Sequence, residues 1–403
     1  MDGKTVTRRE FLEAGAMAAT VAAASGPLKA VGAEKDKTDQ PMLRRTLGRT
    51  GLQVTILNQG EAKVGDRHLN IMHEEGVRFL DSSGWYQGGQ HERDLGQWLN
   101  KTGHRKEYCL ITKDVPRTTD EWVTMLDRRL KNGRQDYYDL YFLHGLGGGD
   151  YPSGCTRWPQ DREWAKTAER IRKSGKARFV GFSLCINPVA RRIELMHRAV
   201  EGGWVDAIMV AADPILLRDN AAYNKAIDAC HKAGIGLICM KEMRGRSQIK
   251  EVFPEFEARG LSSATAVLTA MWTDERFAAV SSHMDNIVKL KENAAAARNF
   301  RPMSEREVGA VRHMLDCHGT GFCIGCDGSC RRAAGTETAF DQIARFLCYY
   351  EENGDREEAR RLFAALPPQA RDWAKADLAA ASRACVSRLD FQRILARAAE
   401  KLA

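Results

Sequence analysis

The segment YDLYFLHG (138–145) is nearly continuous in apolar residues and ends beside a histidine. A strand with this pattern is buried on both faces, as in a parallel sheet covered by helices. Seven similar runs occur, at 54–60, 77–83, 108–113, 177–183, 205–211, 234–241 and 277–284. Amphipathic helical patterns lie between them, for example at 119–134, 164–174, 187–201 and 219–232. Eight strand–helix units in about 250 residues predict an α/β fold, the (β/α)8 TIM barrel.

The main alternative is an open, doubly wound sheet. Such a sheet is expected to carry a glycine-rich dinucleotide-binding turn after an early strand, and the sequence shows none. The segment MLRRTLGRTGL (42–52) precedes the first barrel strand, and we expect a hairpin that closes the barrel floor.

The two ends of the chain differ from the barrel pattern. Residues 1–33 combine Arg8-Arg9 and Phe11-Leu12 with a short apolar run and small residues, which predicts a twin-arginine export signal and a periplasmic or exported protein. An amphipathic N-terminal helix is the alternative. We assign residues 34–300 to the barrel and 301–403 to an α-helical C-terminal domain, which a capping box at Ser304 and Glu307 opens.

The composition excludes some partners. The formal charge of +8 is spread along the chain without a basic stripe, so nucleic acid is not expected as a partner. No apolar run is long enough to cross a bilayer, so we expect no membrane span in the mature chain.

Four polar side chains stand at or just beyond the ends of three successive predicted strands. Asp81 and Tyr86 follow one strand, Lys113 ends the next, and His144 ends the third. The carboxyl ends of barrel strands meet on one face, where active sites lie. A lysine ammonium held by an aspartate is expected to lower the pKa of a nearby tyrosine, which then exchanges a proton with a carbonyl or alcohol oxygen that the histidine orients.

At these positions the chain resembles the aldo-keto reductase family. The resemblance rests on LRRTLGRTGLQV (43–54), FLDSSGWYQGGQHERDLGQWL (79–99), ITK (111–113), DYYDLYFLH (136–144) and SGKARFVGFS (174–183). It implies a catalytic tetrad of Asp81, Tyr86, Lys113 and His144, a small carbonyl or alcohol substrate, and NAD(P)H bound without a Rossmann turn.

The resemblance also implies cofactor-binding residues, but the nicotinamide seat is altered. Ser183 is kept and Leu184 replaces the usual asparagine, while Met209 and Ala212 replace a glutamine and a tyrosine. Lys241 is kept and Glu242 follows it. At the adenine end the implied contacts are Lys289, Glu292 and Asn293. Either NAD(P)H binds in a modified way, or another redox partner, such as a protein, delivers electrons.

The segment CHGTGFCIGCDGSC (317–330) holds four of the eleven cysteines, Cys317, Cys323, Cys326 and Cys330. Thiolates at short spacing suit one [4Fe–4S] cluster, with zinc and disulfides as alternatives. Some aldo-keto-reductase-like proteins carry such a segment with a second cysteine group. Here only Cys385 lies downstream, so we predict at most one cluster and interpret Cys385 as a packed helical residue.

Two functions remain open from the sequence. The first is an exported oxidoreductase of the aldo-keto reductase type, with Tyr86 as acid and base. The second is a non-catalytic binding or electron-carrier protein on the same barrel. The sequence does not indicate the substrate.

Overall fold

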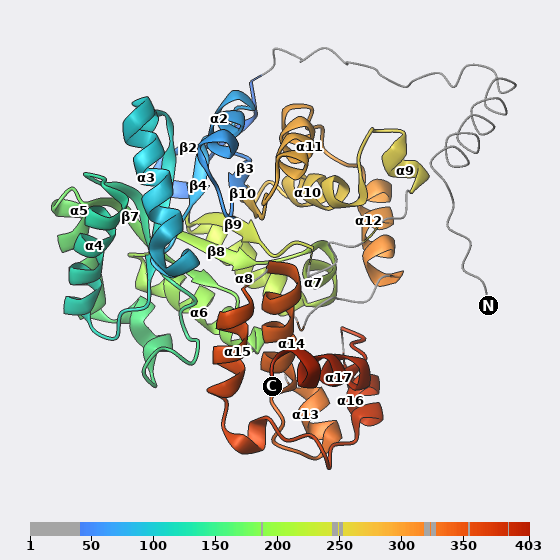
Figure 1. Cartoon of the computed structure of the whole chain (residues 1–403). Coiled ribbons are helices and arrows are strands. Elements are labelled where there is room, and N and C mark those ends of the chain that lie inside the picture. Colours follow the sequence, from blue (N-terminus) through green and yellow to red (C-terminus); the bar gives the residue numbers. More distant parts are fainter. Residues whose placement is uncertain are drawn as a thin grey trace, which may run out of the picture. The chain divides into compact units, whose positions relative to one another are not determined.

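The structure is a computed structural model (Figure 1). It describes residues 41–403 apart from 187, 244–248, 250–252, 318–322, 324–327, 354 and 386. Residues 40–403 form one compact unit. The predicted export signal at residues 1–33 lies outside the described residues.

Eight parallel strands close into a barrel, which confirms the predicted fold class. They are β3 (Leu57–Gln59), β4 (Phe79–Asp81), β5 (Cys109–Asp114), β6 (Tyr138–Leu143), β7 (Ala177–Leu184), β8 (Ala207–Ala211), β9 (Gly236–Met240) and β10 (Phe277–Ser282). Each strand pairs with the next along the chain, and β10 pairs with β3 to close the ring. Every predicted strand run overlaps one of these strands, and β5 and β7 each extend one residue beyond their run.

The predicted hairpin is present and plugs the barrel floor. Strands β1 (Arg44–Thr46) and β2 (Gln53–Thr55) pair in antiparallel fashion. Leu47 and Leu52 between them join the apolar cluster that fills the barrel interior. Arg49 donates to the carbonyls of Gly203 and Val205, which precede β8 and therefore lie at its amino end. The floor is thus closed by side chains and hydrogen bonds together.

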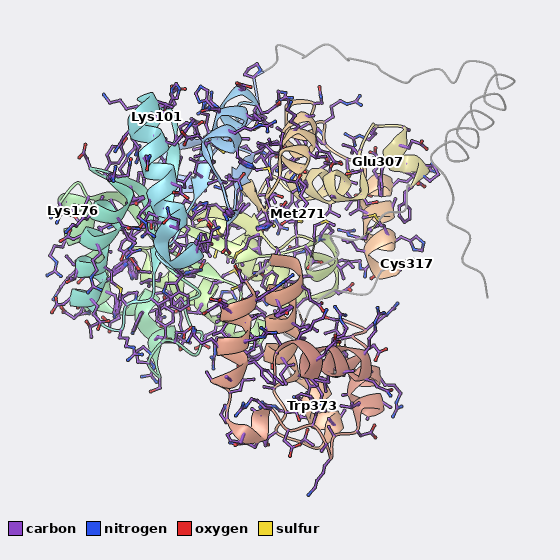
Figure 2. All side chains as sticks on the ribbon, in the orientation of Figure 1. Lys101, Lys176, Met271, Glu307, Cys317 and Trp373 are labelled. Atoms are coloured by element: carbon purple, nitrogen blue, oxygen red, sulfur yellow. The ribbon has the colours of Figure 1, made fainter. Side chains whose placement is uncertain are left out.

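Helices surround the barrel in the order the alternation predicts (Figure 1). They are α2 (Asp66–Glu74), α3 (Gln90–Thr102), α4 (Thr119–Gly133), α5 (Arg162–Lys173), α6 (Val189–Gly202), α7 (Pro214–Asp219), α8 (Ala221–Lys232), α9 (Pro254–Glu257), α10 (Ser263–Thr273) and α11 (Ile287–Arg298). Side chains fill the space between them and the strands (Figure 2). No helix in the described part of the chain is both long and apolar enough to span a bilayer.

Helices dominate the chain after residue 300, and no strand occurs among its described residues. They are α12 (Glu305–Cys317), α13 (Ser329–Ala334), α14 (Phe340–Cys348), α15 (Arg356–Ala364), α16 (Leu378–Ala384) and α17 (Phe391–Lys401). The capping box is present, because Ser304 and Glu307 exchange hydrogen bonds at the start of α12.

The buried face of α12 packs with α10 and α7, whereas α13 to α17 share an apolar core of their own. In this second core, Phe340 and Phe391 lie 4.8 Å apart between ring centroids. We call α13 to α17 the C-terminal helical unit. The predicted domain boundary at residue 300 stays a prediction.

Candidate active site at the barrel mouth

The structure brings the four predicted catalytic side chains together at the carboxyl ends of the strands. Asp81 is the last residue of β4 and Lys113 the second-last of β5. His144 directly follows β6, and Tyr86 begins a short 3-10 turn after β4. Asp81, Lys113 and the backbone around them are buried because neighbouring strands cover both sides.

Asp81 links the other members of the tetrad. The ammonium of Lys113 donates to Oδ1 of Asp81 in a short contact, and the hydroxyl of Tyr86 donates to Oδ2 at 3.2 Å. Nζ of Lys113 lies 4.8 Å from the ring centroid of Tyr86. The rings of Tyr86 and His144 meet edge to face with 5.7 Å between centroids. One carboxylate therefore positions the proton-carrying tyrosine and the lysine beside it.

The pKa of Tyr86 differs from the sequence-based expectation. Burial raises this pKa well above its ordinary value, and the charges of Asp81 and Glu61 act in the same direction. Burial also lowers the pKa of Lys113, while the charge of Asp81 acts in the opposite direction. The tyrosine is consequently held in its protonated, acid form in this arrangement.

His144 is neutral at the barrel mouth. Burial lowers its pKa to about 3, and the charges of Lys113 and Lys241 act in the same direction. Nδ1 of His144 lies 3.1 Å from the hydroxyl of Ser83, which fixes the plane of the ring. A neutral imidazole in a fixed orientation can hydrogen-bond a substrate oxygen without adding charge.

Two groups at this mouth escaped the sequence reasoning. Glu61 lies two residues beyond β3, and burial raises its pKa to about 7. The rule that sites lie at strand ends would have included it. Arg345 comes from α14, and its guanidinium reaches the end of β7. No local signal indicates that contact, because it joins residues 160 positions apart.

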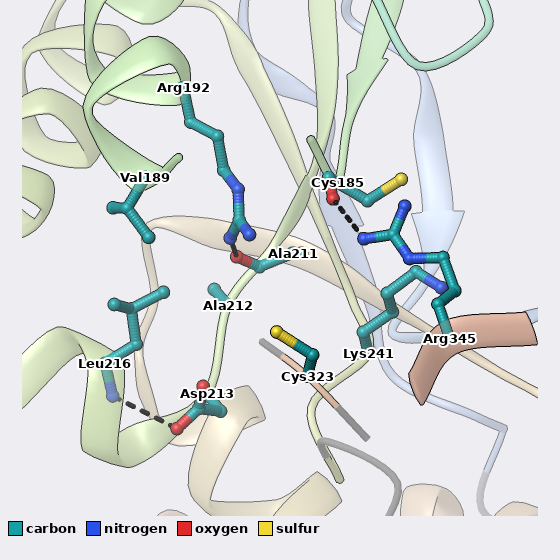
Figure 3. Close-up of a pocket in the computed structure, with 10 residues that line it drawn as sticks. All are labelled: Cys185, Val189, Arg192, Ala211, Ala212, Asp213, Leu216, Lys241, Cys323 and Arg345. Carbon is teal, nitrogen blue, oxygen red and sulfur yellow. Dashed lines mark hydrogen bonds between the residues drawn. The ribbon is translucent and has the colours of Figure 1, made fainter. Parts of the chain in front are cut away.

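A small pocket lies beside the residues expected at the nicotinamide seat, and two of them line it (Figure 3). Ser183 and Met209 are register partners on β7 and β8, and both are buried. The hydroxyl of Ser183 accepts a hydrogen bond from the backbone N–H of Gly145 at 2.8 Å. Ala212 and Lys241 line the pocket itself. The altered seat therefore keeps its predicted location at the ends of β7, β8 and β9.

The residues expected at the adenine end lie on α11, after β10. Lys289 pairs with Asp285 at 2.9 Å and is largely exposed. Asn293 is buried, and its side-chain amide donates to the hydroxyl of Ser282 at 3.1 Å. Glu292 is exposed to solvent. The structure thus places the three together on one helix next to the barrel mouth.

Three of the four predicted metal-binding cysteines are described by the structure, and they lie in two different places. Cys323 and Cys330 are buried in the core of the C-terminal helical unit. Cys317 is exposed at the end of α12, with its Sγ 3.6 Å from Nε2 of His313 (Figure 2). Cys326 lies outside the described residues.

Cys385 belongs with the buried pair. It directly follows α16, which packs against α13, and it is buried in the same core as Cys323 and Cys330. Its backbone is extended at this point, so Cys385 terminates its helix and is not an interior helical residue. Sequence spacing alone did not point to it, because 54 residues separate it from Cys330.

A different cluster lies at the opposite end of the barrel. His73, His104 and Glu107 offer ligand atoms within 4.8 Å of one another. The guanidinium of Arg78 lies 3.5 Å from the carboxylate of Glu107 and 3.4 Å from Nε2 of His73. Arg78 already supplies the positive charge there, so the cluster is best described as a structural ion-pair network at the amino ends of the strands.

Comparisons with known proteins agree with this fold. The aldo/keto reductase family profile matches residues 61–251. The chain is 26% identical over 201 residues to the NADP(+) aldo-keto reductase yakc of Schizosaccharomyces pombe, which is 46% of this chain and 55% of that protein. It is 23% identical over 180 residues to the aldo-keto reductase str7 of Strobilurus tenacellus, or 42% and 47% of the two chains. The chain spans about half the length of the curated relatives it matches.

Solved structures show the same barrel. An aldo-keto reductase from Bacillus halodurans in its holo form matches with a TM-score of 0.53 and 20% identity, over 68% of this chain and 96% of that one. An aldo-keto reductase from Klebsiella pneumoniae in complex with NADPH matches with a TM-score of 0.53 and 18% identity, over 68% and 95%. The chain thus shares the barrel fold of these aldo-keto reductases. Its sequence is similar to that family over residues 61–251.

Proposed function

We propose that the chain is an NADP-linked oxidoreductase of the aldo-keto reductase type that acts on a small carbonyl or alcohol. The convergence of Asp81, Tyr86, Lys113 and His144 at the barrel mouth carries this proposal, because Asp81 contacts both Tyr86 and Lys113. The yakc relative bears NADP(+) in its name, and the Klebsiella pneumoniae protein holds NADPH.

Each residue has a distinct part in the proposed chemistry. Tyr86 gives a proton to the substrate oxygen during carbonyl reduction and takes it back during alcohol oxidation. Its raised pKa keeps the proton in place until negative charge develops on that oxygen. Lys113 and Asp81 orient the phenol, and the neutral imidazole of His144 orients the substrate oxygen. A nicotinamide cofactor supplies or accepts hydride when it is bound.

The proposal is tested by NADPH-dependent reduction of small aldehydes and ketones with the full chain. Tyr86→Phe keeps the ring and removes the proton, so we expect a loss of about 10²- to 10⁴-fold in kcat/KM without a change in unfolding midpoint. Tyr137→Phe is the matched control, because its ring packs on Arg105 just before β6, away from the mouth. Equal activity of the two variants would remove Tyr86 from its role.

A second candidate is a binding or electron-carrier protein without hydride chemistry, with or without a partner protein. The apolar side chains of Leu184, Met209 and Ala212 favour it, because they offer no hydrogen bonds to a carboxamide. Absence of turnover with every carbonyl tested, in a protein that binds NADPH, would support this second function.

We also propose that the C-terminal helical unit holds one [4Fe–4S] cluster, with Cys323, Cys330 and Cys385 among its ligands. Buried thiols gathered in one apolar core suit a soft-metal cluster shielded from water. Cys326 lies within the same sequence motif and is the expected fourth ligand, whereas Cys317 is exposed at the end of a helix with a different core.

Iron and acid-labile sulfide analysis of anaerobically purified chain tests the cluster. About four irons per chain are expected; one bound zinc or loss of thiols to disulfides would contradict the cluster. Cys385→Ser should lower the iron content and change the visible absorption, and Cys317→Ser should leave both unchanged. If Cys317→Ser instead lowers the iron content and Cys385→Ser does not, Cys317 is a ligand and Cys385 is not.

Export through the twin-arginine pathway remains our proposal for residues 1–33, because Arg8-Arg9 precedes Phe11-Leu12 and a short apolar run. Folded export would let a metal cluster be inserted before the protein leaves the cytoplasm. Replacement of Arg8 and Arg9 by lysine should retain the protein in the cytoplasm on cell fractionation. Unchanged export of that variant would refute the twin-arginine route.

A further inference from the structure

The C-terminal helical unit reaches into the seat where the family resemblance places the nicotinamide ring. Residues at the ends of β7, β8 and β9 form one side of the pocket, including Cys185, Ala212 and Lys241. Arg345 and Cys323 form the other side, and Arg345 projects from α14 (Figure 3). Nη2 of Arg345 donates to the backbone carbonyl of Cys185 at 3.3 Å. The seat is therefore closed by a side chain of the same molecule.

The space left beside Arg345 is too small for an aromatic ring. The cavity measures about 30 Å³. A cavity that accepts benzene in a protein core is about 150 Å³. A nicotinamide ring is larger than benzene, so it enters this seat only if the Arg345 side chain leaves it.

The barrel residues at the seat provide few hydrogen-bonding groups for a nicotinamide. The hydroxyl of Ser183 is engaged by the N–H of Gly145. Met209 joins the apolar cluster of the barrel interior, and Ala212 packs toward the helices. A carboxamide that displaced Arg345 can donate to the freed carbonyl of Cys185 but gains no acceptor or donor from Met209 or Ala212. Each hydrogen bond to water that is not replaced is worth roughly 1 kcal/mol or more.

The charge of the seat also opposes an oxidised nicotinamide, which is a cation. Three basic side chains, those of Arg192, Lys241 and Arg345, line the pocket together with the acidic Asp213. Although burial acts to raise the pKa of Cys185, Lys241 and Arg345 outweigh it and lower that pKa, which reports a positive local field. Two unit charges 4 Å apart repel by about 4 kcal/mol at an effective dielectric constant near 20.

We propose that Arg345 is a specificity-determining residue that competes with the nicotinamide ring for this seat, so that the ring enters only when the Arg345 side chain leaves. The inference rests on the proposed function, because the family resemblance defines the seat. Arg345 occupies part of the seat, while Lys289 and Glu292 on α11 stay exposed. Until Arg345 leaves, a dinucleotide binds the full chain mainly by its adenine end.

Two ligands separate the contributions of the two ends. NADPH carries the nicotinamide ring, whereas 2′,5′-ADP reproduces only the adenine end. We measure both dissociation constants with the anaerobic full chain by calorimetry and tryptophan fluorescence. We expect NADPH to bind no more than about threefold more tightly than 2′,5′-ADP. A wild-type preference of about tenfold or more for NADPH would overturn the proposal without any variant.

Arg345→Ala opens the seat, and Arg345→Met keeps the aliphatic stem while removing the guanidinium. We expect at least one of them to increase the preference for NADPH over 2′,5′-ADP by about tenfold. The control is Arg361→Ala, an exposed arginine on α15 that pairs with Glu358. An unchanged preference in both folded Arg345 variants would overturn the proposal, and so would failure of every variant to bind either ligand.

This design also separates the inference from the proposed function. A variant that binds NADPH tightly and reduces no carbonyl would refute the proposed activity while supporting the role of Arg345. A wild-type chain that prefers NADPH strongly and reduces carbonyls would support the proposed activity while refuting the role of Arg345.

Discussion

Replacement of Lys113 by methionine tests whether the buried tetrad is held together by charge. The side chains of Lys113 and Asp81 are 1% and 3% exposed, and their charged groups are in direct contact. Methionine keeps most of the stem volume but leaves the carboxylate without its cation. Breaking a buried pair in this way costs about 3–5 kcal/mol, so we expect Lys113→Met to lower the free energy of unfolding by that amount at pH 8.

The pH dependence has a defined sign. Burial already raises the pKa of Asp81, and Lys113 opposes this rise. Without Lys113 the folded-state pKa of Asp81 rises further above its unfolded value. The variant is then least impaired at low pH, where the carboxyl is protonated in both states, and loses stability as the pH rises through the folded-state pKa.

Urea unfolding followed by circular dichroism, at several pH values, provides the measurement. Asp81→Asn combined with Lys113→Met should recover most of the loss, because it leaves no buried charge unpaired. Lys101→Met is the control, since Lys101 and Asp66 form an exposed pair, 67% and 52% accessible, worth less than about 1 kcal/mol. The reasoning is refuted if Lys113→Met costs no more than Lys101→Met, or if the double variant is as unstable as the single one.

Two further predictions concern stability. Burial raises the pKa of Glu242 to about 7, so its contribution is complete below an unfolded-state pKa near ~4.3 and is lost as the pH rises through 7. We expect the unfolding free energy of Glu242→Gln, relative to that of wild type, to increase by about 2–3 kcal/mol between pH 5 and pH 8 in urea titrations. A difference that does not depend on pH would contradict this. Gly96→Ala should cost about 1–3 kcal/mol in thermal unfolding, because its Cβ would lie 1.8 Å from the carbonyl oxygen of Gly133 between α3 and α4. Gly309→Ala, in an open helical position, should instead be neutral or stabilising by up to about 1 kcal/mol, and equal effects at the two sites would contradict the packing argument.

The sequence predicted the barrel because its strands are buried on both faces. Continuous apolar runs such as 138–145 record that burial directly, and each overlaps an observed strand. The tetrad positions followed from the same reasoning, since the carboxyl ends of parallel strands meet on one face. The local sequence pattern was sufficient to predict the position of a side chain wherever one strand and the loop after it determine its environment.

The remaining features depend on contacts between distant segments. The raised pKa of Tyr86 reflects how deeply the ring is enclosed, which no local pattern reports. Cys385 joins Cys323 and Cys330 because α16 packs against α13. Arg345 reaches the carbonyl of Cys185 at the end of β7 because α14 lies beside the mouth. An arginine in an amphipathic helix ordinarily indicates a solvated face.

The contact that Arg345 makes has an evolutionary consequence. Its acceptor on the barrel is the main-chain carbonyl of residue 185, which every amino acid would supply. Substitution of Cys185 therefore cannot abolish this hydrogen bond by removing its acceptor. A relative that has α14 would gain or lose this hydrogen bond in one of two ways. Either residue 345 is substituted, or α14 moves. Sequence variation at that one helical position is consequently where a lineage could switch the seat between open and closed.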